Sequence, residues 1–208
     1  MGKIQSKREL NKTQKRASLM DSAEKLFVQN GFENTSIDEV AKEAGLTKRT
    51  LYQYFESKED LFYAVVLKGA KLLFSDYEKA MDSGNSTLEK IRLGNRVHLQ
   101  FYMDHKGMFR LLNYMPANRK SSESSPHYRE LKVLDEIRMK HYMKLVDKAR
   151  ADGSINSGLD TKKAVFFAFF SAFSLLYTVS SLNMWDLLEL DEKEFLNFSF
   201  DLVADALK

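Results

Sequence analysis

Apolar residues recur at spacings of three and four along almost the whole chain, which is the pattern of amphipathic helices. The chain has only two prolines, and it has few runs of the β-branched residues that favour strands. No repeat of fixed period is evident, so a solenoid is not supported. The sequence therefore predicts an all-α fold.

The first sixty residues predict three short helices and the start of a longer one. The pair Asn30-Gly31 should end the first helix, because glycine adopts the left-handed conformation at little cost, and Gly45 should end the second for the same reason. Residues that can cap a helix predict where the later helices begin, at Ser36 with Glu39, at Thr47, and at Ser57 with Asp60.

Beyond residue 62 the predicted helices are longer. They cover about residues 86–103 after the cap Ser86, 107–115, 124–152 and 160–184, with a last helix opened by Asp191 and Glu194. Residues 116–127 contain both prolines and several serines, which predicts a long loop or mobile link between two helical blocks.

Residues 164–182 are uncharged and about as long as a membrane span. Their hydroxyl side chains recur at spacings of three and four, and Ala164 and Ala168 extend that stripe of small residues. Small residues in a stripe let another helix approach closely, so we expect a buried interface helix. A membrane-associated helical signalling protein anchored by this segment is the alternative.

Charge and cysteine content narrow the function classes. The net charge is only +3, but residues 1–16 carry six cations and the single acid Glu9, which predicts a basic N-terminal arm or simply a solvated tail. There is no cysteine, so thiol catalysis, disulfides and thiolate metal sites are excluded. No apolar segment follows the N-terminal cations, so a secretory signal is not expected, and the predicted location is the cytoplasm.

The stretch GLTKRTLYQYFESKEDLF, residues 45–62, carries the candidate chemistry. On a helical wheel Leu51 and Phe55 share the inner face, and Arg49 and Gln53 then point away from the core. Arginine and glutamine can hydrogen-bond the edges of guanine and adenine in the major groove. Cations and tyrosines beside them are placed to reach phosphates: Lys48, Tyr52, Tyr54 and Lys58. The alternative is an ordinary solvated helix face.

The same region resembles the DNA-binding signature of TetR-type bacterial transcriptional regulators. The pattern T-[ST]-[IV]-x-x-[IV]-A-x-x-A-G-[LV]-[ST]-x-x-T-[LIV]-Y-x-[YH]-F is matched from Thr35 to Phe55, and S-K-x-x-L follows from Ser57 to Leu61. We find no departure from it. The resemblance covers about residues 15–66, and beyond them it is architectural only.

The resemblance implies an all-helical homodimer whose two helix-turn-helix heads bind a palindromic DNA operator. It places Tyr52 and Lys58 at positions that clamp phosphates, and Thr35 and Ser36 at the start of the helix that crosses the DNA backbone. The candidate DNA-binding residues are Thr35, Ser36, Thr47, Lys48, Arg49, Thr50, Tyr52, Gln53, Tyr54 and Lys58. A larger C-terminal domain would bind a small-molecule effector and dimerise.

The middle helices concentrate aromatic and methionine side chains, which can line an apolar pocket or simply form a core. The candidate ligand-binding residues are Phe101, Met108, Phe109, Leu112, Met139, Tyr142 and Met143, and the expected effector is apolar or amphiphilic. The last two helices are the predicted dimer interface. His98 and His105 share a helical face but lack a third ligand nearby, so neither metal nor cofactor is expected.

These observations predict three segments: a basic arm (1–13), a helix-turn-helix DNA-binding domain (14–60), and an effector-binding and dimerisation domain (61–208). The predicted function is a sequence-specific transcriptional regulator, in the form of a repressor released by its effector. An enzyme is not expected, because no phosphate loop, nucleophile elbow or catalytic cluster is found. A DNA-compacting protein without sequence preference is a further alternative.

Overall fold

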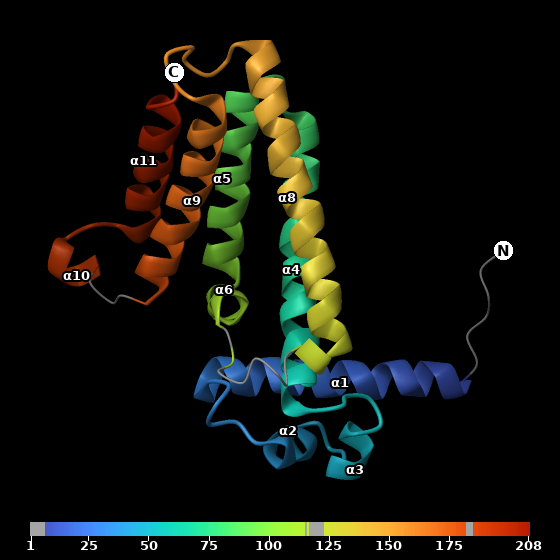
Figure 1. Cartoon of the computed structure of the whole chain (residues 1–208). Helices are drawn as coiled ribbons and strands as arrows, with labels where there is room; N and C mark the ends of the chain where they lie inside the picture. The colour runs from blue at the N-terminus through green and yellow to red at the C-terminus, as the bar shows by residue number, and fades with distance from the viewer. Residues whose placement is uncertain (1–6, 115, 117–122, 182–184) are drawn as a thin grey trace. The chain divides into compact units, whose positions relative to one another are not determined.

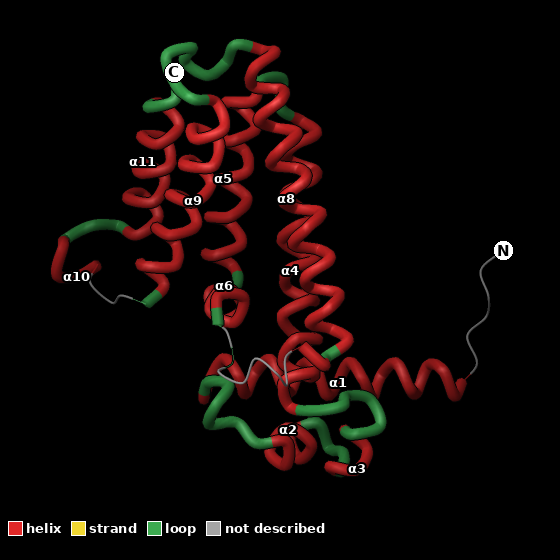
Figure 2. Tube along the Cα trace, in the orientation of Figure 1, coloured by secondary structure: helices red, strands yellow, loops and turns green. Residues whose placement is uncertain are grey.

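The computed structural model describes residues 7–114, 116, 123–181 and 185–208, and the chain within these ranges is helical, with no strand (Figures 1 and 2). The all-α prediction is therefore confirmed. The helices are α1 (Lys7–Asn30), α2 (Ile37–Glu43), α3 (Lys48–Leu51), α4 (Lys58–Ser83), α5 (Thr87–Asp104), α6 (Lys106–Asn113), α8 (Pro126–Asp152), α9 (Thr161–Ser180), α10 (Trp185–Leu188) and α11 (Glu192–Asp205).

The chain forms two compact units. The N-terminal unit consists of Met1–Gly69 and Tyr114–Lys132, and the C-terminal unit consists of Ala70–Asn113 and Val133–Lys208. The predicted boundary at residue 60 lies inside α4, and the sequence did not predict that residues 114–132 join the N-terminal helices. Of the predicted loop 116–127, residues 117–122 lie outside the described residues, while Pro126 and His127 already belong to α8.

The predicted helix caps are confirmed. Ser36 and Glu39 form a reciprocal capping box, and the side chains of Thr47, Ser86 and Asp191 each accept a backbone N–H in the first turn of their helices. Each such bond satisfies a donor that has no partner inside the helix. The helix starts of this fold are therefore encoded locally.

Two elements differ from the sequence expectation. The helix α1 already begins at Lys7, so residues 7–13 of the predicted arm are helical, while residues 1–6 lie outside the described residues. The four-residue helix α10 precedes α11 and was not predicted.

The core of the N-terminal unit is built around packed aromatic rings. Phe62 of α4 lies edge-on to Phe27 and Phe32, with ring centroids 5.6 and 5.0 Å apart. Tyr114 adds a fourth ring, 5.8 Å from that of Phe62, and its hydroxyl donates to Glu33 at 2.7 Å. Offset and edge-to-face pairs of this kind add stability beyond the burial of their area. Tyr114 is thus packed on the N-terminal helices.

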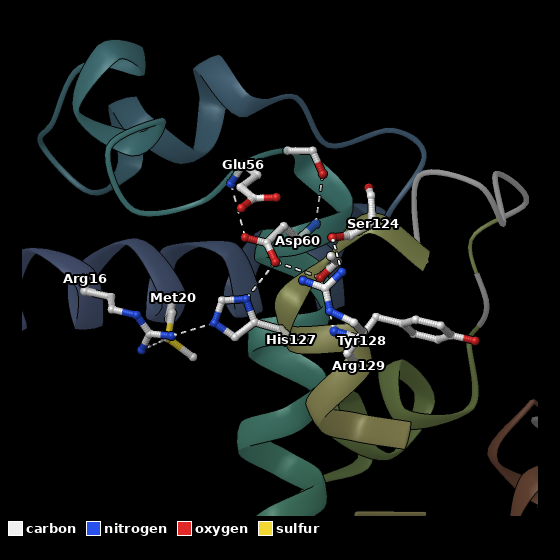
Figure 3. Close-up of polar contacts among 10 residues, drawn as sticks. Arg16, Met20, Glu56, Asp60, Ser124, His127, Tyr128 and Arg129 are labelled. Atoms are coloured by element: carbon white, nitrogen blue, oxygen red, sulfur yellow. Dashed lines mark hydrogen bonds and ion pairs between the residues drawn. The ribbon is translucent and has the colours of Figure 1, made fainter. Parts of the chain in front are cut away.

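A buried carboxylate, Asp60, joins four segments of the N-terminal unit (Figure 3). One oxygen accepts the backbone N–H of Glu56 at 3.1 Å. The other accepts the hydroxyl of Ser125 and Nδ1–H of His127, both at 2.7 Å. On its far side, His127 Nε2 lies 3.0 Å from the guanidinium of Arg16, so it accepts and the imidazole is the neutral Nδ1–H tautomer.

The pKa of Asp60 reflects two opposing effects. Burial alone would raise it, but the hydrogen bonds from His127, Ser125 and the Glu56 backbone, in that order, outweigh burial and lower the pKa to about 2. A carboxylate that accepts three hydrogen bonds is stabilised in its charged form. The folded unit therefore binds this proton less readily than the unfolded chain does.

In the C-terminal unit α5, α9 and α11 pack against one another and run side by side (Figure 1). Arg92 of α5 ties α11 at two points, with distances of 2.8 Å to Asp201 and 2.6 Å to Asp205. At the other joint, Asp152 at the end of α8 accepts the backbone N–H of Thr87 at 2.7 Å and its hydroxyl at 2.8 Å. These contacts fix the ends of the helices around a core that includes Leu176 and Leu196.

Gly94 marks a close approach between helices of the C-terminal unit. A Cβ atom at this position would lie 2.7 Å from the ring of Tyr77 and 3.0 Å from Met81. Tyr77 is itself buried against Tyr142, with ring centroids 5.9 Å apart, so it has little room to move. The glycine is required by packing rather than by its backbone conformation.

The helix α9 is long and apolar enough to cross a membrane by length and composition alone. Core helices of soluble proteins pass the same test. One face of α9, which includes Ala168 and Leu176, is buried in the C-terminal unit, whereas Phe167, Phe170 and Tyr177 are more than half exposed. Ala164 and Ala168 of the predicted small-residue stripe lie on the buried side, whereas its hydroxyl residues Ser174, Thr178 and Ser181 are exposed, so the stripe is buried only at its N-terminal end.

Replacing Asp60 with asparagine should lower the free energy of unfolding by about 1–3 kcal/mol at pH 7, because the amide cannot accept all three bonds of a buried carboxylate. The lowered pKa gives stability that is complete above the unfolded value of 3.8 and lost as the pH falls towards about 2. The free energies of unfolding of the two proteins should therefore approach each other as the pH falls from about 4 to about 2, as measured by urea unfolding.

A matched control is Asp76→Asn, which removes an exposed carboxylate 2.9 Å from Lys79. Exposed pairs of this kind contribute little, so its stability should stay within about 0.5 kcal/mol of the unmodified protein. Equal effects of the two substitutions would show that the Asp60 network carries no special stability.

Replacing Gly94 with alanine should destabilise the protein by about 1–3 kcal/mol, because the added methyl group overlaps the Tyr77 ring. Thermal unfolding followed by circular dichroism measures this. The control is Gly158→Ala, where the new Cβ would meet only Asn156 Oδ1 at 3.2 Å. A Gly94 variant at least as stable as the unmodified protein would show that Tyr77 moves aside freely.

Candidate nucleic-acid interface

A tight turn joins α2 to α3. Gly45 has φ +66°, and the N–H groups of Leu46 and Gly45 bond to the carbonyls of Ala41 and Lys42 at 2.8 and 3.0 Å. This paired bonding is the Schellman motif, in which glycine takes the left-handed position at the end of a helix. Thr47 then caps α3, so only two residues separate the glycine from the next helix. The predicted helix-turn-helix geometry is present.

Residues 47–55, which we call the reading segment because the sequence predicts that they contact bases, contain a shorter helix than the sequence indicated. The wheel assumed a helix as far as Phe55, but α3 ends at Leu51. Two tighter bonds follow, from Gln53 N–H to Thr50 O at 3.1 Å and from Tyr54 N–H to Leu51 O at 2.9 Å. The turn keeps the predicted faces, because Leu51 and Phe55 are buried while Arg49 and Gln53 are exposed.

Arg49 and Gln53 have no structural task in this fold. Both side chains are exposed, and neither makes an ion pair or a side-chain hydrogen bond with any described residue. Tyr52 lies between them along the chain and is 49 % exposed. Side chains free of internal partners can turn towards a ligand without breaking contacts of the fold.

The two lysines expected at phosphates already have partners. Lys48 Nζ lies 2.8 Å from the carboxylate of Asp38, whose hydrogen bond and charge raise the pKa of Lys48. The sequence interpretation overlooked this neighbouring acid. Lys58 donates to the carbonyl of Glu33 at 3.1 Å and lies 4.3 Å from the ring centre of Phe32. Because exposed pairs are weak, Lys48 can exchange its partner for a phosphate.

The hydroxyl residues mainly hold the backbone. Thr35 is 1 % exposed and donates to Gly31 O at 2.8 Å, so its side chain lies inside the unit. Ser36 is exposed and caps α2, while Thr47 and Thr50 contact each other through their hydroxyls at 2.9 Å. Tyr54 is half-buried. Of the ten candidate residues, Arg49, Tyr52 and Gln53 are exposed and make no side-chain hydrogen bond or ion pair with any described residue, whereas Thr35 is buried and cannot contact DNA through its side chain.

The sequence analysis missed a group of residues beside this face. The first turns of α1 and the end of the reading segment line one open groove of about 740 Å³. Its lining residues are Lys7, Arg8, Asn11, Lys12, Lys15, Gln53 and Tyr54. The charge excess of residues 1–16 was visible, and spacings of three and four would have placed these cations on one helix face, had the arm been treated as a helix.

The candidate ligand-binding residues are divided in the C-terminal unit. Phe101, Met108, Phe109 and Tyr142 are buried and Leu112 is half-buried, whereas Met139 and Met143 on α8 are exposed by 45 % and 37 %. The rings of Tyr142 and Phe169 lie 4.1 Å apart. The buried amide nitrogen Asn95 Nδ2 in this unit has no hydrogen-bond partner among the described residues.

Within the described residues there is no group of three or more histidines and carboxylates that could hold a metal ion. His98 is buried and its Nδ1 lies 2.8 Å from Gly94 O, and burial lowers its pKa to about 4. His105 is exposed and lies beside Phe101, with ring centroids 5.0 Å apart and ring planes tilted by 51°. The two histidines therefore have separate environments.

Comparison with known proteins agrees with this geometry. Residues 19–65 match the family model described as bacterial regulatory proteins, tetR family. An HTH-type transcriptional regulator of Staphylococcus aureus is 31% identical over 116 residues, which cover 56% of this chain and 62% of that protein. The chain thus matches less than two thirds of this relative's length.

Solved structures share the fold over nearly the whole chain. The fatty acid degradation regulator FadR from Bacillus halodurans has a TM-score of 0.69 at 16% identity, covering 91% of this chain and 94% of that one. The ketosteroid transcriptional regulator KstR2 of Mycobacterium tuberculosis has a TM-score of 0.70 at 16% identity, covering 100% and 97%. Residues 19–65, with their helix-turn-helix, are thus similar to the DNA-binding domain of the tetR family of bacterial regulatory proteins, and the chain shares the fold of these solved transcriptional regulators.

Proposed function

We propose that this protein is a sequence-specific DNA-binding transcriptional repressor of the cytoplasm that leaves a palindromic operator when a small-molecule effector binds. The observation that carries the proposal is the pair Arg49 and Gln53, both exposed and without internal partners on a segment held by Thr47, Leu51 and Phe55. Bidentate contacts from such side chains to guanine and adenine read sequence in the major groove. Tyr52 beside them would contact the DNA backbone.

A homodimer through the last two helices supplies the second head that a palindrome requires. The C-terminal unit exposes large apolar side chains on these helices, with Phe198 and Leu202 of α11 exposed by 64 % and 59 %. Phe167 and Phe170 of α9 are exposed by 57 % and 54 %. Exposed apolar patches of this kind mark interaction surfaces, and two such helix pairs related by a twofold axis form a four-helix bundle.

The same apolar side chains also explain why α9 resembles a membrane span. A dimer interface on one face and the unit's own core on the other leave little of the helix polar. The buried face supports the dimer over the membrane-anchored alternative, because a single span surrounded by lipid has no use for a packed protein face.

The effector would bind in the C-terminal unit near Tyr142. Buried polar atoms without partners are uncommon, and Asn95 Nδ2 is one of them, in a unit rich in aromatic rings. An amphiphilic molecule with a hydrogen-bond acceptor would satisfy the amide while its apolar part contacts the rings. This supports the amphiphilic class over a purely apolar effector.

Replacing Arg49 with alanine should relax the preferred base at one or two positions of each half-site, because a bidentate contact contributes about 1–3 kcal/mol of discrimination. Replacing Tyr52 with phenylalanine should instead weaken binding to all duplexes alike, because phosphates carry no sequence information. Selection of binding sites from random duplexes, followed by gel-shift titration, measures both. Identical selected sites for Arg49→Ala and the unmodified protein would refute the reading role.

Replacing Phe198 and Leu202 together with serine should convert the protein to a monomer in sedimentation velocity, because the exposed apolar face of α11 is lost. The helical content should not change. The control is Leu72→Ser, which alters an apolar residue of α4 that is 47 % exposed and should leave the dimer intact. A dimer that survives the α11 substitutions would place the interface elsewhere.

A further inference from the structure

The first turns of α1 carry a stripe of cations. Arg8, Lys12 and Lys15 are four and three residues apart, so they lie on one face of the helix, and Lys7 and Asn11 flank them. From Lys7 to Lys15 the helix rises about 12 Å at 1.5 Å per residue. Phosphates along one DNA strand advance about 3.4 Å each. These phosphate spacings are rises along the duplex axis, so a stripe lying parallel to that axis covers the rise of three or four phosphates.

This stripe and the reading segment face the same groove. Lys7, Arg8, Lys12 and Lys15 line one side of the open groove, and Gln53 and Tyr54 line the other. Gln53 follows Arg49 by one helical turn on the exposed face of that segment. A strand of DNA contacted by Gln53 would thus bring its phosphates towards the α1 cations.

The cations of the stripe are not compensated within the protein. All four are exposed and make no ion pair with any residue that the structure describes, whereas Lys25 further along α1 pairs with Glu43 at 2.5 Å. Glu9 is the one acid in the first two turns of α1. Like charges four residues apart destabilise a helix, and solvated helices usually alternate their charges. A bound polyanion would remove this repulsion.

The stripe also lies outside the part of the chain that the family model matches. That match starts at residue 19, whereas the stripe ends at residue 15. The cations therefore precede the matched residues and are additional to the helix-turn-helix residues.

We propose that the first two turns of α1 form a second DNA-contact surface, which grips backbone phosphates next to the bases read by Arg49 and Gln53. The proposal rests on the proposed function and deepens it by adding a sequence-independent contact. It follows from the continuity of the groove with the reading face and from the complementarity between a row of cations and a row of phosphates. An acidic protein or an anionic membrane would be a different occupant of the same stripe.

The test compares two charge-matched variants of the full chain. The first carries Arg8→Gln, Lys12→Gln and Lys15→Gln. The control carries Lys140→Gln, Lys144→Gln and Lys148→Gln, which follow one another at intervals of four residues and so share one face of α8 in the C-terminal unit. Each variant lowers the net charge from +3 to 0, and glutamine keeps the helix propensity of lysine and arginine.

Binding is measured by gel-shift titration over a series of salt concentrations, with a duplex selected by the unmodified protein and with a duplex of random sequence. Phosphate ethylation interference on the selected duplex locates the contacts. In the stripe variant, the negative slope of log K against log salt should become shallower by about 0.9 for each lost phosphate contact, and this should hold for both duplexes. It should also lose a set of interfering phosphates while the selected sequence stays the same. The control variant should match the unmodified protein in both respects.

Two results would overturn the proposal. One is an unchanged slope and interference pattern in the stripe variant, which would leave the cations to solvent or to an acidic or lipid partner. The other is an equal loss in the control variant, which would mean that only net charge matters. Failure of the proposed function looks different, because the unmodified protein would then bind selected and random duplexes equally, whatever the stripe does.

Discussion

The N-terminal unit depends on one buried charge. The carboxylate of Asp60 accepts the backbone N–H of Glu56, directly after the reading segment, and also holds Ser125 and His127 at the start of α8. His127 in turn accepts from Arg16, whose guanidinium lies 5.4 Å from the ring centre of Phe55. A charge removed from water in this way is stable only while its hydrogen bonds are complete. The residues directly after the reading segment and the start of α8 are therefore held by the same carboxylate, and loss of either contact weakens the other.

The fold was predictable wherever its cause is local. Capping side chains and glycine stops act within one turn of a helix, so the starts at Ser36, Thr47, Ser86 and Asp191 and the stop at Gly31 followed from spacing alone. The addition of residues 114–132 to the N-terminal unit was not predictable, because it depends on contacts such as those from Tyr114 to Phe62 and from His127 to Asp60. Such contacts join residues more than fifty positions apart and leave no periodic signal.

The sequence predicted which side chains of the candidate interface are exposed, but it did not predict which neighbouring residues they contact. Burial of Leu51 and Phe55 fixed the exposure of Arg49 and Gln53, although the helix proved shorter than assumed. The wheel places side chains around an axis and does not show which neighbour they meet. The pairing of Lys48 with Asp38 and the burial of Thr35 therefore needed coordinates. In the C-terminal unit the aromatic and methionine content did not separate buried Phe109 from exposed Met139, because both types occur in cores and on surfaces.

In the reading segment, the residues that hold its shape are different from the residues that are proposed to contact bases. Thr47, Leu51 and Phe55 determine its shape, whereas the side chains of Arg49 and Gln53 are exposed and make no ion pair or hydrogen bond with any described residue. Substitutions at the second pair consequently leave stability almost unchanged, since exposed positions without partners tolerate most side chains. The operator and the protein can then diverge together by single steps, each through a folded intermediate. Under the proposed reading role, Arg49 and Gln53 are thus positions at which DNA specificity can evolve without cost to folding.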